Sequence, residues 1–240
     1  MISVLLFVLM FQSPIQKIES QNVRLYYSGA TARQNAKGWL NFIQGVFKTD
    51  VKQIKYGQDR KINVRLCRDY LEFTRVSGLD SVFAPAQVNG ILYVVCPDSS
   101  ADGSYIEKLS RGVLLQLLTP LHSNGMPWWL IYSVAVYESG ELQSLSPVPF
   151  ISVHYLNDLE ERIQNTSSGS NYEETLYYLG ITGEFLEVKF GAGSLVGLLH
   201  EFTRANTFDS AIRRVLHVDK HRLEDEWRDY LKKEIRMLRY

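Results

Sequence analysis

The sequence predicts an α+β protein, in which a small N-terminal mixed sheet with a long helix precedes a mainly helical C-terminal part. Two observations support this prediction. In the first hundred residues, short runs rich in β-branched and aromatic residues flank one long stretch of helical periodicity. In the rest of the chain, helix-capping signals and apolar residues at helical spacing replace the strand-like runs. Because no repeat or long linker interrupts the 240 residues, we expect one domain with a sheet subdomain over 21–100 and a helical subdomain over 101–240.

Composition limits the classes of function. The chain has 26 Lys and Arg and 26 Asp and Glu, so its net charge is zero. A generic nucleic-acid binder carries a basic excess, and no nucleic-acid partner is therefore expected. No apolar run reaches the roughly 18 residues that span a bilayer, which predicts no transmembrane segment.

The N-terminus has the pattern of an export signal. Ile2 to Phe11 form a largely apolar stretch, too short to cross a membrane but typical of the central region of a signal peptide. Ser20 is a small residue at the expected cleavage site, although no Lys or Arg precedes the apolar run. We predict a signal peptide over 1–20, a mature chain from about Gln21, and a secreted or periplasmic location. A buried N-terminal strand is the alternative.

The sheet subdomain is predicted from alternating patterns and one amphipathic stretch. Ala36, Leu40, Ile43 and Phe47 recur at helical spacing, and Asn89–Gly90 is a favourable hairpin turn. The expected strands are Val23–Tyr27, Ile62–Cys67, Val82–Ala84 and Ile91–Cys96, and the expected helices are Thr31–Val51 and Asp69–Val76.

The helical subdomain is predicted from caps and breakers. Ser104 with Glu107, and Ser170 with Glu173, form capping boxes, while Asp219 is placed to cap the last helix. Pro127 suits the first position of a helix. The expected helices are Tyr105–Leu118, Trp128–Tyr137, a helix from Ser170 towards Gly191, Ser194–Arg204, Asp209–Leu216, and a last one to about Met237.

Two cysteines end strand-like runs. Cys67 and Cys96 form a disulfide candidate if the two strands are neighbours in an oxidising compartment. Two buried thiols are the alternative, and the sequence leaves both open.

The segment from Leu109 to Gly140 resembles the core of the peptidase MA-like (gluzincin) zinc metallopeptidases. In that family, a helix carrying HExxH precedes a helix with the pattern P-x-W-L-x-E-G-x-A-x-Y. The second pattern is matched here at Pro127, Trp129, Leu130, Ala135 and Tyr137. Val23–Leu71 is similar to the strand–helix–strand opening of the family, and Tyr172–Leu238 is similar to its C-terminal helices. The resemblance therefore implies a zincin-like fold over 21–240.

The resemblance also shows what is missing. The spacing places the two histidines of HExxH at Arg111 and Leu115, the water-activating glutamate at Gly112, and the third zinc ligand at Tyr132. Zinc in such a site needs two imidazoles and a carboxylate, which these four residues do not provide. The resemblance thus implies a catalytically inactive member, with no metal, no cofactor and no catalytic residue.

No replacement metal site is expected elsewhere. His200–Glu201 begins like HExxH, but the fifth residue is Arg204. His217 and His221 are four residues apart, but Asp219 between them is expected to cap a helix, so they do not share a helical face.

Close packing predicts that Leu115 and Tyr132 fill the volume of the absent zinc. Arg111 has two interpretations: an ion pair with Glu107 one turn away, or a cation in the old cleft that binds a ligand carboxylate. Trp129 is expected in the core and Trp128 as an exposed contact. The candidate ligand-binding residues are therefore Arg111, Trp128 and Tyr132.

The expected function is an exported, metallopeptidase-like protein without activity that binds a peptide or a protein. By resemblance, a peptide would add along the sheet edge near Ile91–Val95. One alternative is an active metal-dependent peptidase with non-standard ligands, and another is a structural envelope component with a filled groove. Asn165-Thr166-Ser167 is a glycosylation sequon only in a eukaryotic secretory route.

Overall fold

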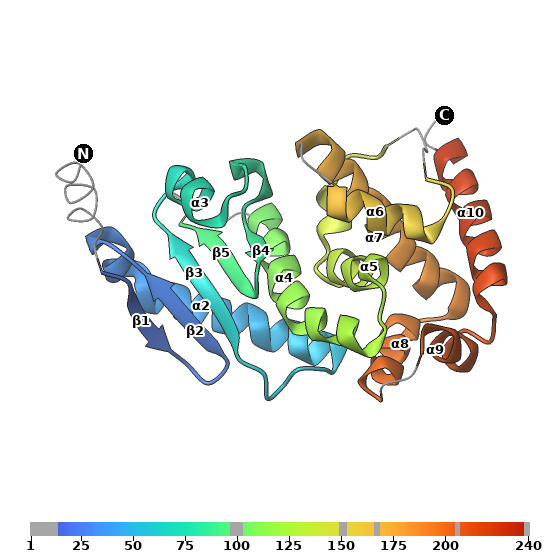
Figure 1. Cartoon of the computed structure of the whole chain (residues 1–240), viewed down its shortest axis with the longest axis horizontal. Coiled ribbons are helices and arrows are strands. Elements are labelled where there is room, and N and C mark those ends of the chain that lie inside the picture. The colour runs from blue at the N-terminus through green and yellow to red at the C-terminus, as the bar shows by residue number, and fades with distance from the viewer. Residues whose placement is uncertain (1–13, 97–102, 149–152, 166–168, 205–206, 238–240) are drawn as a thin grey trace, which may run out of the picture. The chain divides into compact units, whose positions relative to one another are not determined.

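The computed structural model describes residues 14–96, 103–148, 153–165, 169–204 and 207–237, and it has the predicted α+β architecture (Figure 1). Contacts divide these residues into two compact units. The sheet unit comprises 14–45 and 59–96, and the helical unit comprises 46–58 and 103–237. Helix α2 (Ala30–Ile54) contributes to both units, so the second unit begins inside a helix that the sequence assigns to the sheet subdomain.

The described strands form one mixed sheet. Its order is β1-β2-β3-β5-β4, with bounds Gln16–Glu19, Val23–Tyr27, Ile62–Cys67, Ile91–Val95 and Ala86–Val88 in that order. β2, β3 and β5 are parallel, whereas β1 and β4 run antiparallel at the two edges. The predicted strands Val23–Tyr27 and Ile62–Cys67 are confirmed residue for residue, and the predicted Ile91–Cys96 is one residue longer than β5.

The two faces of the sheet differ in burial because side chains alternate along each strand. On the inner face, Val23, Leu25, Val64, Leu92 and Val94 are fully or almost fully buried. Figure 1 shows α2 along this unit, and its residues Ala36, Leu40 and Ile43 are buried at helical spacing as predicted. On the outer face, the alternate residues of β2, β3 and β5 remain partly exposed, except for Cys67 and Val95 at the strand ends, which are buried.

A short helix covers one end of the outer face. α3 (Tyr70–Ser77) contacts β3 and β5. Asp69 caps it by accepting a hydrogen bond from the Glu72 backbone N–H at 2.8 Å. Gly78 ends it in the left-handed conformation, with φ of 75°. The predicted helix over Asp69–Val76 is thus confirmed with an offset of one residue at each end.

The predicted strand Val82–Ala84 is wrong. Ser81–Phe83 form a 3₁₀ turn, η1, because Asp80 accepts a hydrogen bond from the Val82 N–H at 3.1 Å and caps it. The strand that pairs with β5 starts after Pro85, at Ala86. Asn89 and Gly90 form the predicted two-residue turn, both with positive φ.

The position of the sheet edge also differs from the prediction. β5 lies between β3 and β4, so Ile91–Val95 is not an edge strand. The edge beside it is β4, which has three residues. In a hairpin with a two-residue turn, the residues that flank the turn, here Val88 and Ile91, form a hydrogen-bonded pair. Hydrogen-bonded and non-hydrogen-bonded pairs alternate along an antiparallel ladder, so the backbone N–H and C=O of Gln87 point away from β5.

Strand β1 was not predicted, and it lies within the expected signal peptide. Glu19 at its end forms ion pairs with Lys17 at 2.8 Å, Arg24 at 3.1 Å and Lys61 at 3.0 Å. Cleavage after Ser20 would remove this strand and its ladder with β2. A cut before Gln16 would retain both. The apolar run Ile2–Phe11 lies outside the described residues.

The helical unit contains the helices that the periodicity predicted, and α6 in addition. Their bounds are α4 Gly103–Leu118, α5 Trp128–Glu138, α6 Leu156–Asn165, α7 Gly169–Phe190, α8 Ser194–Thr203, α9 Phe208–Val215 and α10 Lys220–Met237; two 3₁₀ segments, η2 Thr119–Asn124 and η3 Glu141–Ser144, connect them. Asp219 caps α10 as predicted, accepting from the Arg222 N–H at 2.9 Å. Ser104 and Ser170 are the second residues of α4 and α7, and Pro127 is the N-cap of α5.

α5 and α7 approach closely because α7 carries glycine at the contact. A Cβ atom on Gly183 would lie 2.6 Å from Tyr137 Cβ and 2.9 Å from the Ser133 carbonyl oxygen. A Cβ on Gly180 would lie 2.8 Å from Leu142 Cδ1. These two glycines therefore set the distance at which α7 packs on α5 and η3.

Cys67 and Cys96 are present as thiols. The Cys96 N–H donates to the Cys67 carbonyl oxygen at 3.0 Å, but the strand register pairs Cys67 with Val95. Partnered residues point to the same face of a sheet, and successive residues point to opposite faces. The side chain of Cys96, which follows Val95, therefore points to the face opposite to that of Cys67. The disulfide stays a prediction, and the register opposes it.

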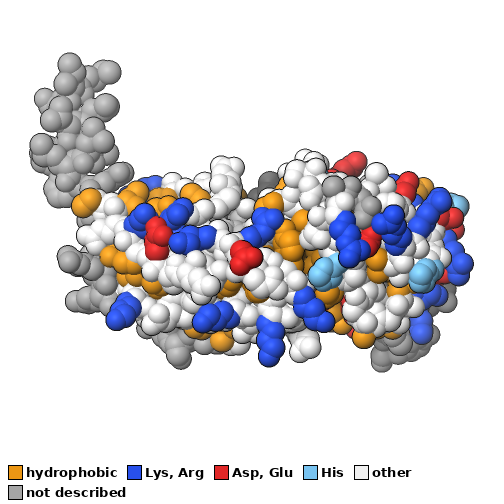
Figure 2. Space-filling model, turned by 90° about the horizontal axis from the view of Figure 1, so that it is seen from below, with side chains coloured by type: hydrophobic (Ala, Val, Ile, Leu, Met, Phe, Trp, Pro, Cys, Tyr) orange, Lys and Arg blue, Asp and Glu red, His pale blue; other side chains and the backbone are white. Residues whose placement is uncertain are grey.

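No helix within the described ranges is long and apolar enough to cross a bilayer. Figure 2 shows Lys and Arg side chains spread along one face, among neutral and hydrophobic side chains.

Candidate functional site

Helices α4 and α5 carry the four residues at which the resemblance places the zinc ligands and the glutamate, and all of them except the partly exposed Tyr132 are buried in the helical unit. On α4, every residue from Leu109 to Leu115 is buried. On α5, the residues from Trp129 to Val136 are buried, apart from Tyr132. Such an apolar circumference is typical of helices with neighbours on all sides. Among the polar residues of these two stretches, which also include Ser110 and Ser133, Arg111 and Tyr132 are the two that define the candidate site.

Arg111 is enclosed by partners that the sequence did not indicate. Its side chain is 3% exposed, and Nε donates to Glu141 Oε2 at 2.5 Å. Nη1 donates to the hydroxyl oxygen of Tyr172, and Cζ lies 5.4 Å from the centroid of that ring. The predicted pair with Glu107 is wrong, because Glu107 accepts a hydrogen bond from Ser144 instead. A solvent-facing cation in a cleft is equally inconsistent with this burial.

Glu141 reaches Arg111 because the chain turns sharply after α5. Gly140 adopts the left-handed conformation, with φ of 79°, and η3 begins at the next residue. The Glu141 side chain is 1% exposed, and its N–H donates to Ser139 Oγ at 3.3 Å. Oε1 is buried and has no hydrogen-bond partner among the described residues. The sequence contained one signal for this arrangement, a lone acidic residue directly after a helix stop, but that signal does not identify the partner.

Tyr132 joins this cluster to a row of aromatic side chains. Burial raises the pKa of its hydroxyl, Tyr172 raises it further, and the Arg111 charge lowers it. On its other side, the Tyr132 ring lies 6.4 Å from that of Trp128. Trp128 in turn stacks on His122, with centroids 4.5 Å apart and planes at 26°. We call His122, Trp128 and Tyr132 the aromatic row.

The structure thus brings together the three predicted ligand-binding residues. Trp128 and Tyr132 are partly exposed, as a contact residue must be, and His122 is exposed. Trp129 is 2% exposed and packs edge-on against Phe208 at 5.8 Å, which confirms it as a core residue. His122, which the sequence left without a role, was missed because its partner lies beyond a 3₁₀ segment and a turn.

The residues at the zinc-ligand positions do not fit a zinc ion. Leu115 is 3% exposed and has no donor atom, Gly112 has no side chain, and the Arg111 guanidinium is held by a carboxylate. In the part of the chain that the structure describes, no three His, Cys, Asp or Glu side chains form a group that could hold a metal ion.

The other histidine motifs lie apart from this site. Glu201, beside His200, forms ion pairs with Arg204 at 2.9 Å and Arg214 at 3.1 Å. His217 and His221 are both exposed. His217 has a positive φ of 58°, so it lies outside the regular helix that carries His221.

A second buried acid of the helical unit contacts Ser110, the residue that precedes Arg111 on α4. Asp50, on the part of α2 that belongs to the helical unit, is 4% exposed and accepts a hydrogen bond from Ser110 Oγ at 2.7 Å. Its Oδ2 is buried without a hydrogen-bond partner within the described ranges. Burial raises the pKa of Asp50 to about 7, and the Ser110 hydrogen bond opposes this rise.

Comparison with known proteins gives no family: no protein-family model matches the chain, and no curated protein matches its sequence. The gluzincin resemblance therefore depends on the residues of α4 and α5 and on their spacing.

Breaking the buried pair from one side is expected to destabilise the protein strongly. Glu141→Leu leaves the Arg111 guanidinium buried without its carboxylate, which costs about 3 to 5 kcal/mol. The double variant Arg111→Met with Glu141→Leu removes both charges and should recover most of this loss. Urea unfolding of both variants measures the two free energies. The control is Arg222→Ala, which breaks an exposed pair with Glu226 and should cost about 1 kcal/mol or less. Equal losses in Glu141→Leu and Arg222→Ala would contradict the buried pair.

Asp50 is expected to make stability fall as pH rises. Its pKa is about 7 in the folded protein and about 3.9 in an unfolded chain, so the folded state holds its proton more tightly. The resulting stability is fully present below pH 4 and is lost as pH rises through 7, by about 1.4 kcal/mol per unit of pKa difference. Asp50→Asn should therefore be more stable than the wild type at pH 8 and similar at pH 4, in urea titrations. Asp229→Asn, at an exposed acid, is the matched control. A wild-type stability that rises between pH 4 and 8 relative to Asp50→Asn would overturn this assignment.

Proposed function

We propose that this chain is an exported, catalytically inactive metallopeptidase-like protein whose role is to bind a peptide or a protein. The observation that carries the proposal is the arrangement at the positions of the zinc site. A gluzincin would hold a metal and a water molecule there, whereas this chain has the buried Arg111–Glu141 pair with Tyr172.

The chemistry of these residues supports the absence of hydrolysis. Peptide hydrolysis by this class needs a Lewis acid and a base that activates water. Arg111 is already paired and cannot serve as a base, because its guanidinium does not deprotonate in proteins. Tyr132 is a weak base candidate as well, because burial raises the pKa of a phenol that is already near 10. We therefore assign no catalytic step to these residues.

The aromatic row is the surface that we assign to the partner. His122 and Trp128 present stacked rings to solvent, and Tyr132 connects them to the buried cluster. Partly exposed aromatic side chains contribute large contact areas at low entropic cost and often dominate recognition of peptides. The sheet edge offers fewer backbone hydrogen bonds to a peptide than the resemblance implied, because β4 is three residues long and follows Pro85, which has no N–H.

The partner assignment is tested by selecting peptides on the intact protein. Peptides from a random displayed library that bind the wild type should bind Trp128→Ala about tenfold more weakly or worse, because the stacked platform is lost. The matched control is Tyr155→Ala, which removes an exposed aromatic side chain outside the row. Affinities by fluorescence polarisation that are equal for the wild type and Trp128→Ala would exclude the aromatic row as the binding surface.

Rebuilding the ancestral ligand set tests the resemblance itself. The variant Arg111→His, Gly112→Glu, Leu115→His, Tyr132→Glu also carries Glu141→Gln, so that no buried carboxylate is left unpaired. If α4 and α5 are arranged as in a gluzincin, it should bind one equivalent of zinc about 100-fold more tightly than a control that retains Leu115.

Metal analysis and a competing chelator measure this difference, and circular dichroism verifies folding. A folded variant that binds zinc no better than the control would contradict the gluzincin arrangement. The wild type is expected to lack tightly bound zinc and chelator-sensitive peptidase activity. Finding both would establish the alternative, a peptidase with non-standard ligands.

A further inference from the structure

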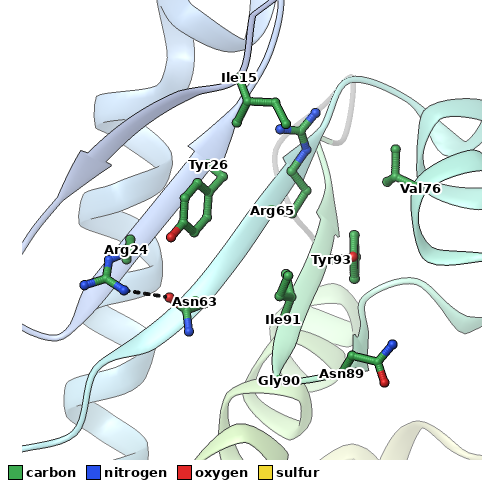
Figure 3. A pocket seen from close by; sticks show the side chains of 10 residues that line it. All are labelled: Ile15, Arg24, Tyr26, Asn63, Arg65, Val76, Asn89, Gly90, Ile91 and Tyr93. Atoms are coloured by element: carbon green, nitrogen blue, oxygen red, sulfur yellow. Dashed lines mark hydrogen bonds between the residues drawn. The ribbon is translucent and has the colours of Figure 1, made fainter.

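The outer face of the sheet contains a groove that the proposed function does not use. Its volume is about 600 Å³, within the usual range for small-ligand pockets. All of its lining residues belong to the sheet unit. Figure 3 shows the side chains of β2, β3 and β5 on its floor, with α3 on one side and the β4–β5 turn at one end.

Strand register arranges the floor in two rows across three parallel strands. In one row, Tyr26 is the partner of Arg65, and Arg65 is the partner of Tyr93. Partnered residues point to the same face, so an arginine lies between two tyrosines. In the other row, Arg24 is the partner of Asn63, and its Nη1 donates to Asn63 Oδ1 at 3.3 Å.

Apolar side chains form the rest of the wall. Ile91 lies on the floor beside Asn63, Val76 of α3 forms one side, and Ile15 stands before β1 on another. Ile15 is 66% exposed and Val76 is 36% exposed. An apolar body can therefore lie across this groove while its polar end reaches the arginines.

Arg65 is held in place, yet it retains an unused donor. Nη2 donates to Glu72 Oε1 at 3.1 Å and to Ser28 Oγ at 3.0 Å. Glu72 is itself fixed, since it also accepts from the Arg68 N–H at 2.9 Å. Nη1 of Arg65 is buried and makes no hydrogen bond to any described residue. A buried unpaired guanidinium donor costs free energy. A ligand acceptor recovers that cost once the Arg65 side chain, 11% exposed, turns Nη1 toward the groove.

The charge around the groove is positive. Two arginines line it, and none of the lining residues is acidic. Arg24 shares its counterion Glu19 with Lys17 and Lys61, so one carboxylate faces three cations. The electrostatic potential around Arg24 is therefore positive and favours an anion.

We propose that this groove binds a small organic carboxylate with an aromatic or branched apolar group. The carboxylate is received by Arg65, and the apolar group lies against Tyr26, Tyr93 and Ile91. The groove is formed by a sheet face and not by a strand edge, so it offers side chains and no backbone ladder to a peptide. This site is independent of the aromatic row and of the inactive zinc position.

Three probes of similar type test the proposal on the full chain. 3-Phenylpropanoate carries both groups, 3-phenylpropanamide lacks the charge, and butyrate lacks the ring. Protein-detected NMR titration should give saturable binding of 3-phenylpropanoate, about tenfold tighter than either of the other two. Absence of binding by 3-phenylpropanoate at about 10 mM, roughly the weakest affinity expected of such a ligand, would overturn the proposal. Equal binding of the amide would overturn it as well.

Two variants locate the binding. Arg65→Gln removes the unused donor and should weaken 3-phenylpropanoate about tenfold or more. Because it also removes a partner of Glu72, the second variant leaves every polar contact intact: Val76→Trp fills the groove from α3 and should abolish binding. Its matched control, Val188→Trp, places the same ring at a position that is 66% exposed in the helical unit and should bind normally. Unchanged binding in Val76→Trp, or binding of acidic peptides without the small acid, would overturn the proposal.

Discussion

The guanidinium of Arg111 and the carboxylate of Glu141 meet in the interior of the helical unit, and the surrounding chain is arranged to make that contact possible. A lone charge at this depth would be costly, so α4, η3 and α7 each supply one member of the cluster. Gly140 permits the turn that returns Glu141 to α4, and the glycines of α7 allow that helix to approach α5. A buried pair of this kind contributes little net stability, but it penalises every arrangement in which the two charges are apart.

The same cluster determines the chemical character of the site. A zinc site is built from neutral imidazoles and a carboxylate around an open position. Here the carboxylate is matched by a permanent cation, and Leu115, one turn after Arg111 on α4, is buried. The aromatic row lies where this closed interior meets solvent, through Tyr132. Such a surface offers contact area through its partly exposed rings.

The sheet unit shows how one periodicity produces two different surfaces. Alternation along β2, β3 and β5 gives an inner face of aliphatic side chains and an outer face of Arg, Tyr and Asn. α3 is too short to cover the outer face, and the uncovered part is the groove. β1 completes the sheet with a ladder and the Glu19 ion pairs, which is why the position of any leader cleavage matters for this unit.

Local signals in the sequence determined most of the elements: the strands at Val23 and Ile62, the caps at Asp69 and Asp219, the Asn89–Gly90 turn and the buried helices α4 and α5. They failed where a nearby alternative was physically stronger, as at Val82, where Asp80 caps a 3₁₀ turn, and at β1, which resembled the end of a leader. Tertiary structure alone decided the partner of Arg111, since Glu141 is 30 positions away in the chain and an i,i+4 partner was available. Tertiary structure also determined that Tyr26, Arg65 and Tyr93 lie in one row. The register of parallel strands depends on how the strands pack together on their shared inner face, and the sequence of one strand does not contain that information.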